Sequence, residues 1–113
     1  MTRASRGMYL PDTQRKALHD IRRTVDAVAR DDQRYSDIPV VADTRDHRRC
    51  TFGAAGKSYS CTMLMFKRLA QNGMITLHVG RRPATHEIRL TPQGVRRTTV
   101  SVQSEADAGG VAQ

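Results

Sequence analysis

The chain has 113 residues, a formal net charge of +8 and no tryptophan. A chain of this length forms one domain with a modest core, which Leu, Ile, Val and Met must fill. The charge favours nucleic acid or an anionic surface as partner. No apolar run approaches the roughly 20 residues that a membrane-spanning helix needs. A cytoplasmic protein with no membrane partner and with reduced thiols is therefore expected.

A first helix is predicted from about Asp12 to Ala29. Asp12 or Thr13 can cap it, because a side-chain oxygen there accepts from the free N–H groups of the first turn. Its apolar residues recur at spacings of three and four and form a core-facing stripe: Ala17, Leu18, Ile21, Val25 and Val28. The predicted domain covers residues 11–102, between a flexible basic arm over 1–10 and a disordered tail over 103–113.

Residues 33–57 leave several interpretations open. Ser36 or Asp37 can start a helix with Pro39 in its first turn, but Val40-Val41 also favours a short extended segment. The polar stretch over 44–49 can hold a phosphate backbone or form an exposed loop. Residues 53–56, Gly-Ala-Ala-Gly, predict a turn.

A helix followed by a hairpin is predicted from Ser58 onward. Ser58 or Ser60 caps the helix, and Asn72-Gly73 ends it with a left-handed residue. The helical period turns four residues inward: Thr62, Met65, Phe66 and Leu69. Two alternating runs then predict strands with an apolar inner face: Ile75, Leu77 and Val79 in the first, Ile88 and Leu90 in the second. After them, a brief helix from Thr91 or Pro92 and a strand from Thr98 are both compatible with the pattern.

Two phrases in this half carry a resemblance. Lys67-Arg68-Leu69-Ala70-Gln71-Asn72-Gly73-Met74-Ile75 and Leu90-Thr91-Pro92-Gln93-Gly94 resemble winged-helix regulators of the MarR and PadR kinds. In those families the first phrase ends the recognition helix and enters the wing, and the second closes the wing. The resemblance covers about residues 59–97. It implies an α+β fold, a winged helix-turn-helix, mainly helical with a two- or three-stranded antiparallel wing.

The resemblance and the charge together predict a DNA-binding surface with three parts. The helix would enter the major groove, the arginines at the hairpin tip would contact the backbone or minor groove, and the stretch over 44–49 would hold phosphates. Met63 or Leu64 contacts a thymine methyl in this interpretation, or is buried in the alternative one. The predicted DNA-binding residues are Arg45, Arg48, Arg49, Lys57, Ser58, Tyr59, Ser60, Met63, Lys67, Arg81 and Arg82.

The sequence contains little that indicates an enzyme or a metal site. Residues 53–58 are two residues short of a phosphate-binding G-x-x-x-x-G-K-S loop. The cysteines and histidines lack the paired spacing of a metal site, and no oriented base accompanies a nucleophile. Cys61 is either a thiol of lowered pKa near a helix N-terminus or an inert, partly buried one. No catalytic residue, metal or cofactor is predicted.

The sequence therefore predicts a regulator of transcription that binds double-stranded DNA sequence-specifically. The expected form is a homodimeric repressor of the phage, plasmid or bacterial type, and steep salt dependence is expected of its affinity. The alternative is a winged-helix protein-interaction module, in which the apolar side of the helix binds another protein and there is no specific DNA readout.

Overall fold

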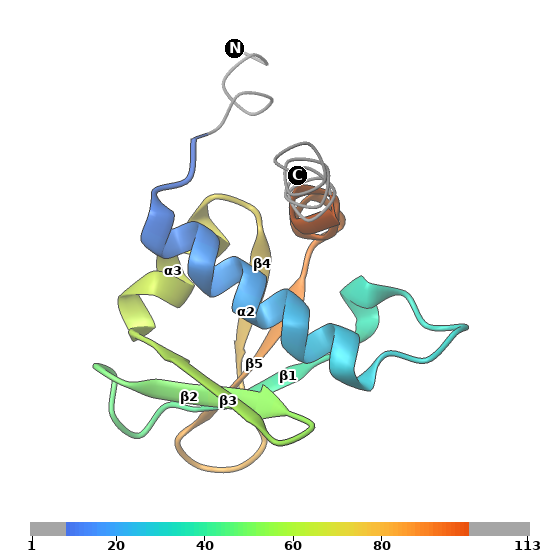
Figure 1. The fold of residues 1–113 in the computed structure, drawn as a ribbon. Coiled ribbons are helices and arrows are strands. Elements are labelled where there is room, and N and C mark those ends of the chain that lie inside the picture. The colour runs from blue at the N-terminus through green and yellow to red at the C-terminus, as the bar shows by residue number, and fades with distance from the viewer. Residues whose placement is uncertain (1–8, 100–113) are drawn as a thin grey trace.

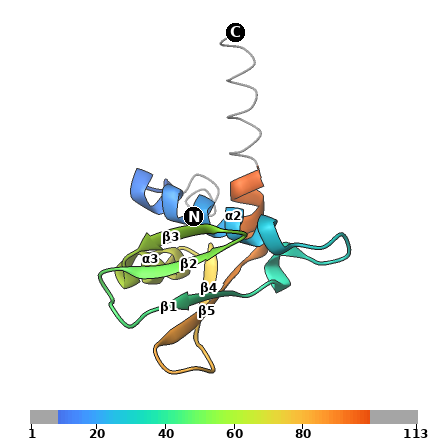
Figure 2. The ribbon, with the colours of Figure 1, turned by 60° about the horizontal axis from the view of Figure 1, so that its bottom comes forward.

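The structure, a computed structural model, describes residues 9–99. Five antiparallel strands form one sheet in the order β3-β2-β1-β5-β4. Helix α2 crosses one face of the sheet, and α3 lies beside α2 and packs against β4 (Figure 1; Figure 2). The predicted arm and tail lie outside the described residues, except for Tyr9, which is exposed, and Leu10, which is buried in the core.

Helix α2 (Asp12–Val28) confirms the predicted first helix. Its stripe of Ala17, Leu18, Ile21 and Val25 is buried, whereas Val28 in the last turn is exposed. The N-cap residue is Pro11, without a side-chain cap bond. The helix ends where Ala29 adopts an extended conformation.

The stretch that the sequence left open forms a short 3-10 turn and three strands. The turn η1 (Tyr35–Asp37) leads into β1 (Val40–Asp43), the central strand of the sheet. A hairpin of β2 (Cys50–Ala54) and β3 (Lys57–Cys61) follows. Its two-residue turn has φ of 55° at Ala55 and 80° at Gly56, which is the backbone that a tight hairpin requires.

Helix α3 (Met63–Gln71) begins later than expected. Thr62 is its N-cap, and its side-chain oxygen accepts from the Met65 backbone N–H at 3.1 Å. Gly73, with φ of 77°, turns the chain from the helix into the next hairpin. That hairpin joins β4 (Ile75–Val79) to β5 (Thr85–Leu90), as predicted.

The predicted fold class is wrong. The fold is α+β, but its centre is a five-stranded antiparallel sheet, not a mainly helical winged helix-turn-helix with a two- or three-stranded wing. Lys57–Cys61 pairs with β2 instead of forming the first turn of a recognition helix. A strand therefore occupies the place where a helix-turn-helix has its preceding helix. The local patterns of α3 and its hairpin suit both folds, so they did not discriminate between them.

Arg22 of α2 contacts both the helix over 92–99 and the turn η1. Its Nη1 donates to the side-chain oxygens of Thr98 at 2.9 Å and Thr99 at 2.7 Å, on a helix over 92–99. Its guanidinium also lies 4.5 Å from the ring centroid of Tyr35 in η1. This contact holds the last described helix against α2. Of the two alternatives left open after the hairpin, the structure has the helix, over 92–99.

We predict that Phe66→Ala lowers the free energy of unfolding by about 3–5 kcal/mol, because Phe66 is fully buried and its removal leaves a cavity. Leu64→Ala on the same helix is the matched control. Leu64 is 57% exposed, and its truncation changes stability by no more than about 0.5 kcal/mol. Urea denaturation followed by circular dichroism measures both, and equal losses would contradict the placement of α3.

Candidate nucleic-acid interface

The pairing of β1 with β5 brings two distant loops to one end of the sheet. Asp43, the last residue of β1, faces Thr85, the first residue of β5. The loop over 44–49 and the turn over 80–84 therefore leave the sheet side by side (Figure 1; Figure 2). Beyond the strands, the Thr44 backbone N–H donates to the Ala84 carbonyl at 2.8 Å.

A polar side-chain contact also joins the end of β1 to β5. Thr44 is 3% exposed, and its hydroxyl lies 2.7 Å from Nδ1 of His86 on β5. A hydrogen bond shielded from water holds its two partners more firmly than an exposed one. The two loops are therefore attached to a common, well-packed base.

Five exposed arginines surround this base, and we call them the arginine rim: Arg45, Arg48, Arg49, Arg81 and Arg82. Two carboxylates, Asp43 and Asp46, lie among them, so the formal charge is +5 − 2 = +3. Within residues 9–99, Arg45 is the one member that forms an ion pair. The other four guanidiniums keep their charge and their donors for a partner.

The carboxylates of the rim are engaged within their own loop. Asp43 accepts from Nη2 of Arg45 at 2.7 Å, and this hydrogen bond lowers the pKa of the Asp43 carboxyl. Asp46 accepts from the Arg48 backbone N–H at 2.9 Å, which forms a local turn. These contacts shape the loop while the long arginine side chains extend into solvent.

A shallow depression separates the two loops. It encloses about 390 Å³, and its lining includes Arg45 and Asp43 beside the first loop and Arg82 from the turn. The turn over 80–84 is tight at this point, since Ala84 has φ of 60° and the Thr85 hydroxyl donates to the Arg82 carbonyl at 2.7 Å. Arg45 is paired with Asp43 at this depression, so Arg82 is the lining arginine whose guanidinium is free to bind a phosphate group.

The N-terminus of α3 adjoins the rim. The Met63 backbone N–H donates to the His47 carbonyl at 2.8 Å, which connects the helix to the loop over 44–49. On the helix, exposed residues recur at spacings of three and four and form one face: Leu64, Lys67, Arg68 and Gln71. Lys67 was among the DNA-binding residues predicted from the sequence, whereas Arg68 and Gln71 were not, although their spacing from Leu64 was visible.

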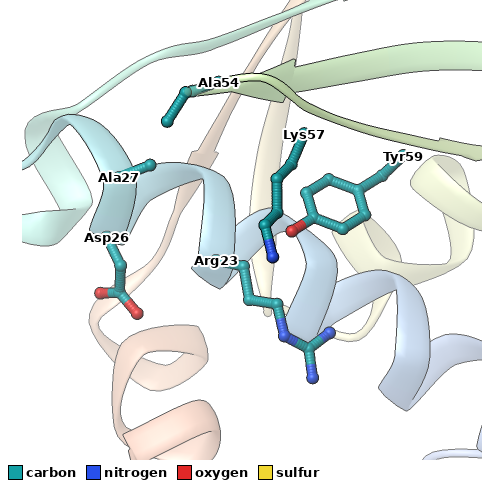
Figure 3. Close-up of a pocket in the computed structure, with 7 residues that line it drawn as sticks. Arg23, Asp26, Ala27, Ala54, Lys57 and Tyr59 are labelled. Atoms are coloured by element: carbon teal, nitrogen blue, oxygen red, sulfur yellow. The ribbon is translucent and has the colours of Figure 1, made fainter.

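The remaining predicted DNA-binding residues lie elsewhere. Met63 is 4% exposed and belongs to the core, so it faces neither solvent nor a partner. Lys57 and Tyr59 point from β3 toward α2, on the covered face of the sheet (Figure 3). Ser58 and Ser60 alternate with them and are exposed on the opposite face. The sequence grouped these four at a helix N-terminus, and the structure distributes them over both faces of a strand.

The two cysteines face each other across β2 and β3 as free thiols. Burial is the main cause that raises the pKa of Cys61 to about 12, and it also raises the pKa of Cys50. Both are therefore protonated at neutral pH, which favours the inert interpretation of Cys61. In the part of the chain that the structure describes, no cluster of His, Cys, Asp or Glu is arranged to hold a metal ion.

The residues that resemble a phosphate-binding loop, 53–58, form the β2–β3 hairpin. Gly53 is required there, because a Cβ at this position would lie 2.0 Å from the Lys57 carbonyl oxygen. The residues after the turn continue as a strand, so they offer no helix N-terminus to a phosphate. Over residues 9–99, no helix is long and apolar enough to cross a membrane.

Comparisons with known proteins give no relative. No protein family matches the chain, and neither a curated protein nor a solved structure matches it.

We predict that Thr44→Val destabilises the fold by about 1 kcal/mol and loosens the rim, because it removes the hydroxyl that bonds His86. Thr51→Val on β2 is the control, since Thr51 lies near the same end of the sheet without a side-chain hydrogen bond among the described residues. Thermal denaturation and amide exchange at residues 44–49 measure the effects. The same protection in both variants would contradict the role of Thr44.

We predict that Cys61 in a Cys50→Ser variant reacts far more slowly with iodoacetamide in the folded state than in urea, because the thiolate is the nucleophile. The folded state binds the thiol proton more tightly than the unfolded state. The contribution of Cys61 to stability is therefore complete below pH 9.0 and falls as the pH rises from 9.0 toward about 12. Equal rates at pH 8 with and without urea would contradict a raised pKa.

Proposed function

We propose that this protein binds double-stranded DNA through the arginine rim and regulates transcription in the cytoplasm of its host. The observation that carries the proposal is the convergence of five exposed arginines from two loops on one end of the sheet. Only one of them is paired with a carboxylate in the described part of the chain. The proposed homodimer presents two such rims to a palindromic or repeated site.

Duplex DNA suits the rim because of its charge density. DNA carries one negative charge for about every 1.7 Å of helix axis, so several phosphates lie within reach of the two loops. A guanidinium binds phosphate oxygens in pairs through its planar fork. Arg82, at the depression, fits one phosphate, and Arg48, Arg49 and Arg81 fit its neighbours, while Arg45 stays paired with Asp43.

The charge at the other end of β1 supports one orientation on DNA. The segment over 26–37, which precedes β1, holds four aspartates and two arginines, a formal charge of −4 + 2 = −2. The rim, at the far end of the strand, carries +3. This polarity turns the rim toward a polyanion before contact and steers association.

We assign base reading to the exposed face of α3. Lys67 and Gln71 are one turn apart and are side chains that bond base edges in the major groove. Leu64 and Arg68 complete the face, with an apolar group for a thymine methyl and a further guanidinium. The connection from His47 to Met63 places the start of this face beside the rim.

We predict that the double variant Arg81→Ala, Arg82→Ala weakens binding to duplex DNA about equally for all sequences. The slope of log K against log salt concentration becomes shallower by about 2, since two phosphate contacts no longer release counterions. Mobility-shift titrations at two salt concentrations measure affinity and slope together.

The matched control is Arg30→Ala, Arg34→Ala, which removes the same charge from exposed positions near the other end of β1. Its affinity and slope stay much closer to those of the unaltered protein. The same loss in both double variants would mean that net charge, not the rim, binds DNA. The absence of duplex binding even at low salt would overturn the proposed function.

A second candidate is a protein-interaction module, favoured by one observation. Val79, at the end of edge strand β4, is 81% exposed, and an edge strand with an exposed apolar residue can pair with another chain. Val79→Lys distinguishes the candidates, because it adds a charge at that edge and leaves the rim arginines in place. Loss of binding to a partner protein in Val79→Lys, together with no duplex binding by the unaltered protein, favours this candidate.

A further inference from the structure

A groove lies on the face of the sheet that α2 covers, and its lining residues take no part in the proposed DNA binding. It lies between the C-terminal half of α2 and the β2–β3 hairpin, and it encloses about 330 Å³ (Figure 3). Its lining residues are Arg23, Asp26 and Ala27 from α2, with Ala54, Ala55, Lys57 and Tyr59 from the hairpin.

Three donors line this groove, and Figure 3 shows the Arg23 guanidinium directed away from the Lys57 ammonium and the Tyr59 hydroxyl. Lys57 and Tyr59 are two residues apart on β3, so the ammonium and the phenol hydroxyl point to the same side, toward α2 (Figure 3). The Tyr59 ring is held by Phe52, with ring centroids 5.8 Å apart. A hydroxyl on a packed ring is preorganised for a ligand.

These donors are largely available. Neither the Lys57 ammonium nor the Tyr59 hydroxyl forms a hydrogen bond or ion pair with another residue in the range 9–99. Arg23 donates from Nη1 to the buried Asp20 at 2.8 Å, which fixes the guanidinium and leaves Nε and Nη2 for a ligand. The groove is therefore rich in donors and short of acceptors.

The one carboxylate among the residues that line the groove already forms an ion pair. Asp26 accepts from Nε of Arg22 at 3.0 Å, so its charge opposes an anion less than an unpaired carboxylate would. One of its oxygens can still accept from a hydroxyl on a ligand. The alanines provide a small apolar surface beside the cations.

We propose that this groove binds a small phosphomonoester whose organic part carries a hydroxyl group. The Lys57 ammonium and the Tyr59 hydroxyl contact the phosphate oxygens, and the Arg23 guanidinium, which pairs with Asp20, adds free N–H donors at the margin of the groove. The organic part lies on Ala27, Ala54 and Ala55, and its hydroxyl donates to Asp26. The volume suits a ligand of a few heavy atoms beyond the phosphate.

The groove is separate from the arginine rim. Strand β2 begins beside the rim at Cys50 and ends at the hairpin turn after Ala54, so about 13 Å of strand lies between them. Occupancy of one site does not require the other. The proposal therefore stands independently of DNA binding.

Titration of the full chain with glycerol 3-phosphate at constant ionic strength, followed by two-dimensional NMR, tests the proposal. We expect saturable shifts at Arg23, Lys57 and Tyr59, with none at residues 81–82, and no response to glycerol alone. Lys57→Gln weakens binding by about tenfold or more, because a charge-assisted contact is lost. Arg34→Gln, an exposed cation outside the groove, leaves the affinity unchanged.

Tyr59→Phe provides a second variant, which keeps the ring packing on Phe52 and removes only the hydroxyl. It weakens binding while the spectrum of the free protein stays that of a folded chain. The proposal is overturned by the absence of saturable shifts, by shifts that map to the rim, or by unchanged affinity in both Lys57→Gln and Tyr59→Phe.

Discussion

The pairing of β1 with β5 is the constraint on which the rest of the structure depends. It joins the β2–β3 hairpin to the β4–β5 hairpin, so two local units become one sheet with one core. The register from Val40↔Ile88 to Asp43↔Thr85 also sets which loops meet. A slip by one residue would turn Val40 and Ala42, now buried, away from the core.

The sequence predicted the elements that local periodicity defines and missed those that depend on distant partners. The apolar stripe of α2 and the alternation of β4 and β5 were visible within single windows. Lys57–Cys61 was taken for the start of a helix, because serines cap helices and its pairing with β2 leaves no periodic signal. The arginines were named individually, but the rim depends on a contact between residues about 40 positions apart.

The arginine rim and the groove are built in a similar way but suit different ligands. Each combines cations from two elements and has a hydrogen bond to a buried residue, His86 with Thr44 at the rim and Arg23 with Asp20 near the groove. The rim is open and extended, which suits a polyanion. The groove lies between helix and hairpin and is lined in part by alanines, which suits a small ligand. Both sites come from the sheet that replaced the expected helix-turn-helix.

The most direct test of the account is an NMR titration of the full chain with duplex DNA at low salt. The central claim predicts that amide shifts concentrate in the loop over 44–49, in the turn over 80–84 and along the exposed face of α3, and that they fade together as salt is added. Shifts confined to other surfaces, or spread evenly over all exposed cations, would contradict the claim that β1–β5 pairing builds a nucleic-acid interface.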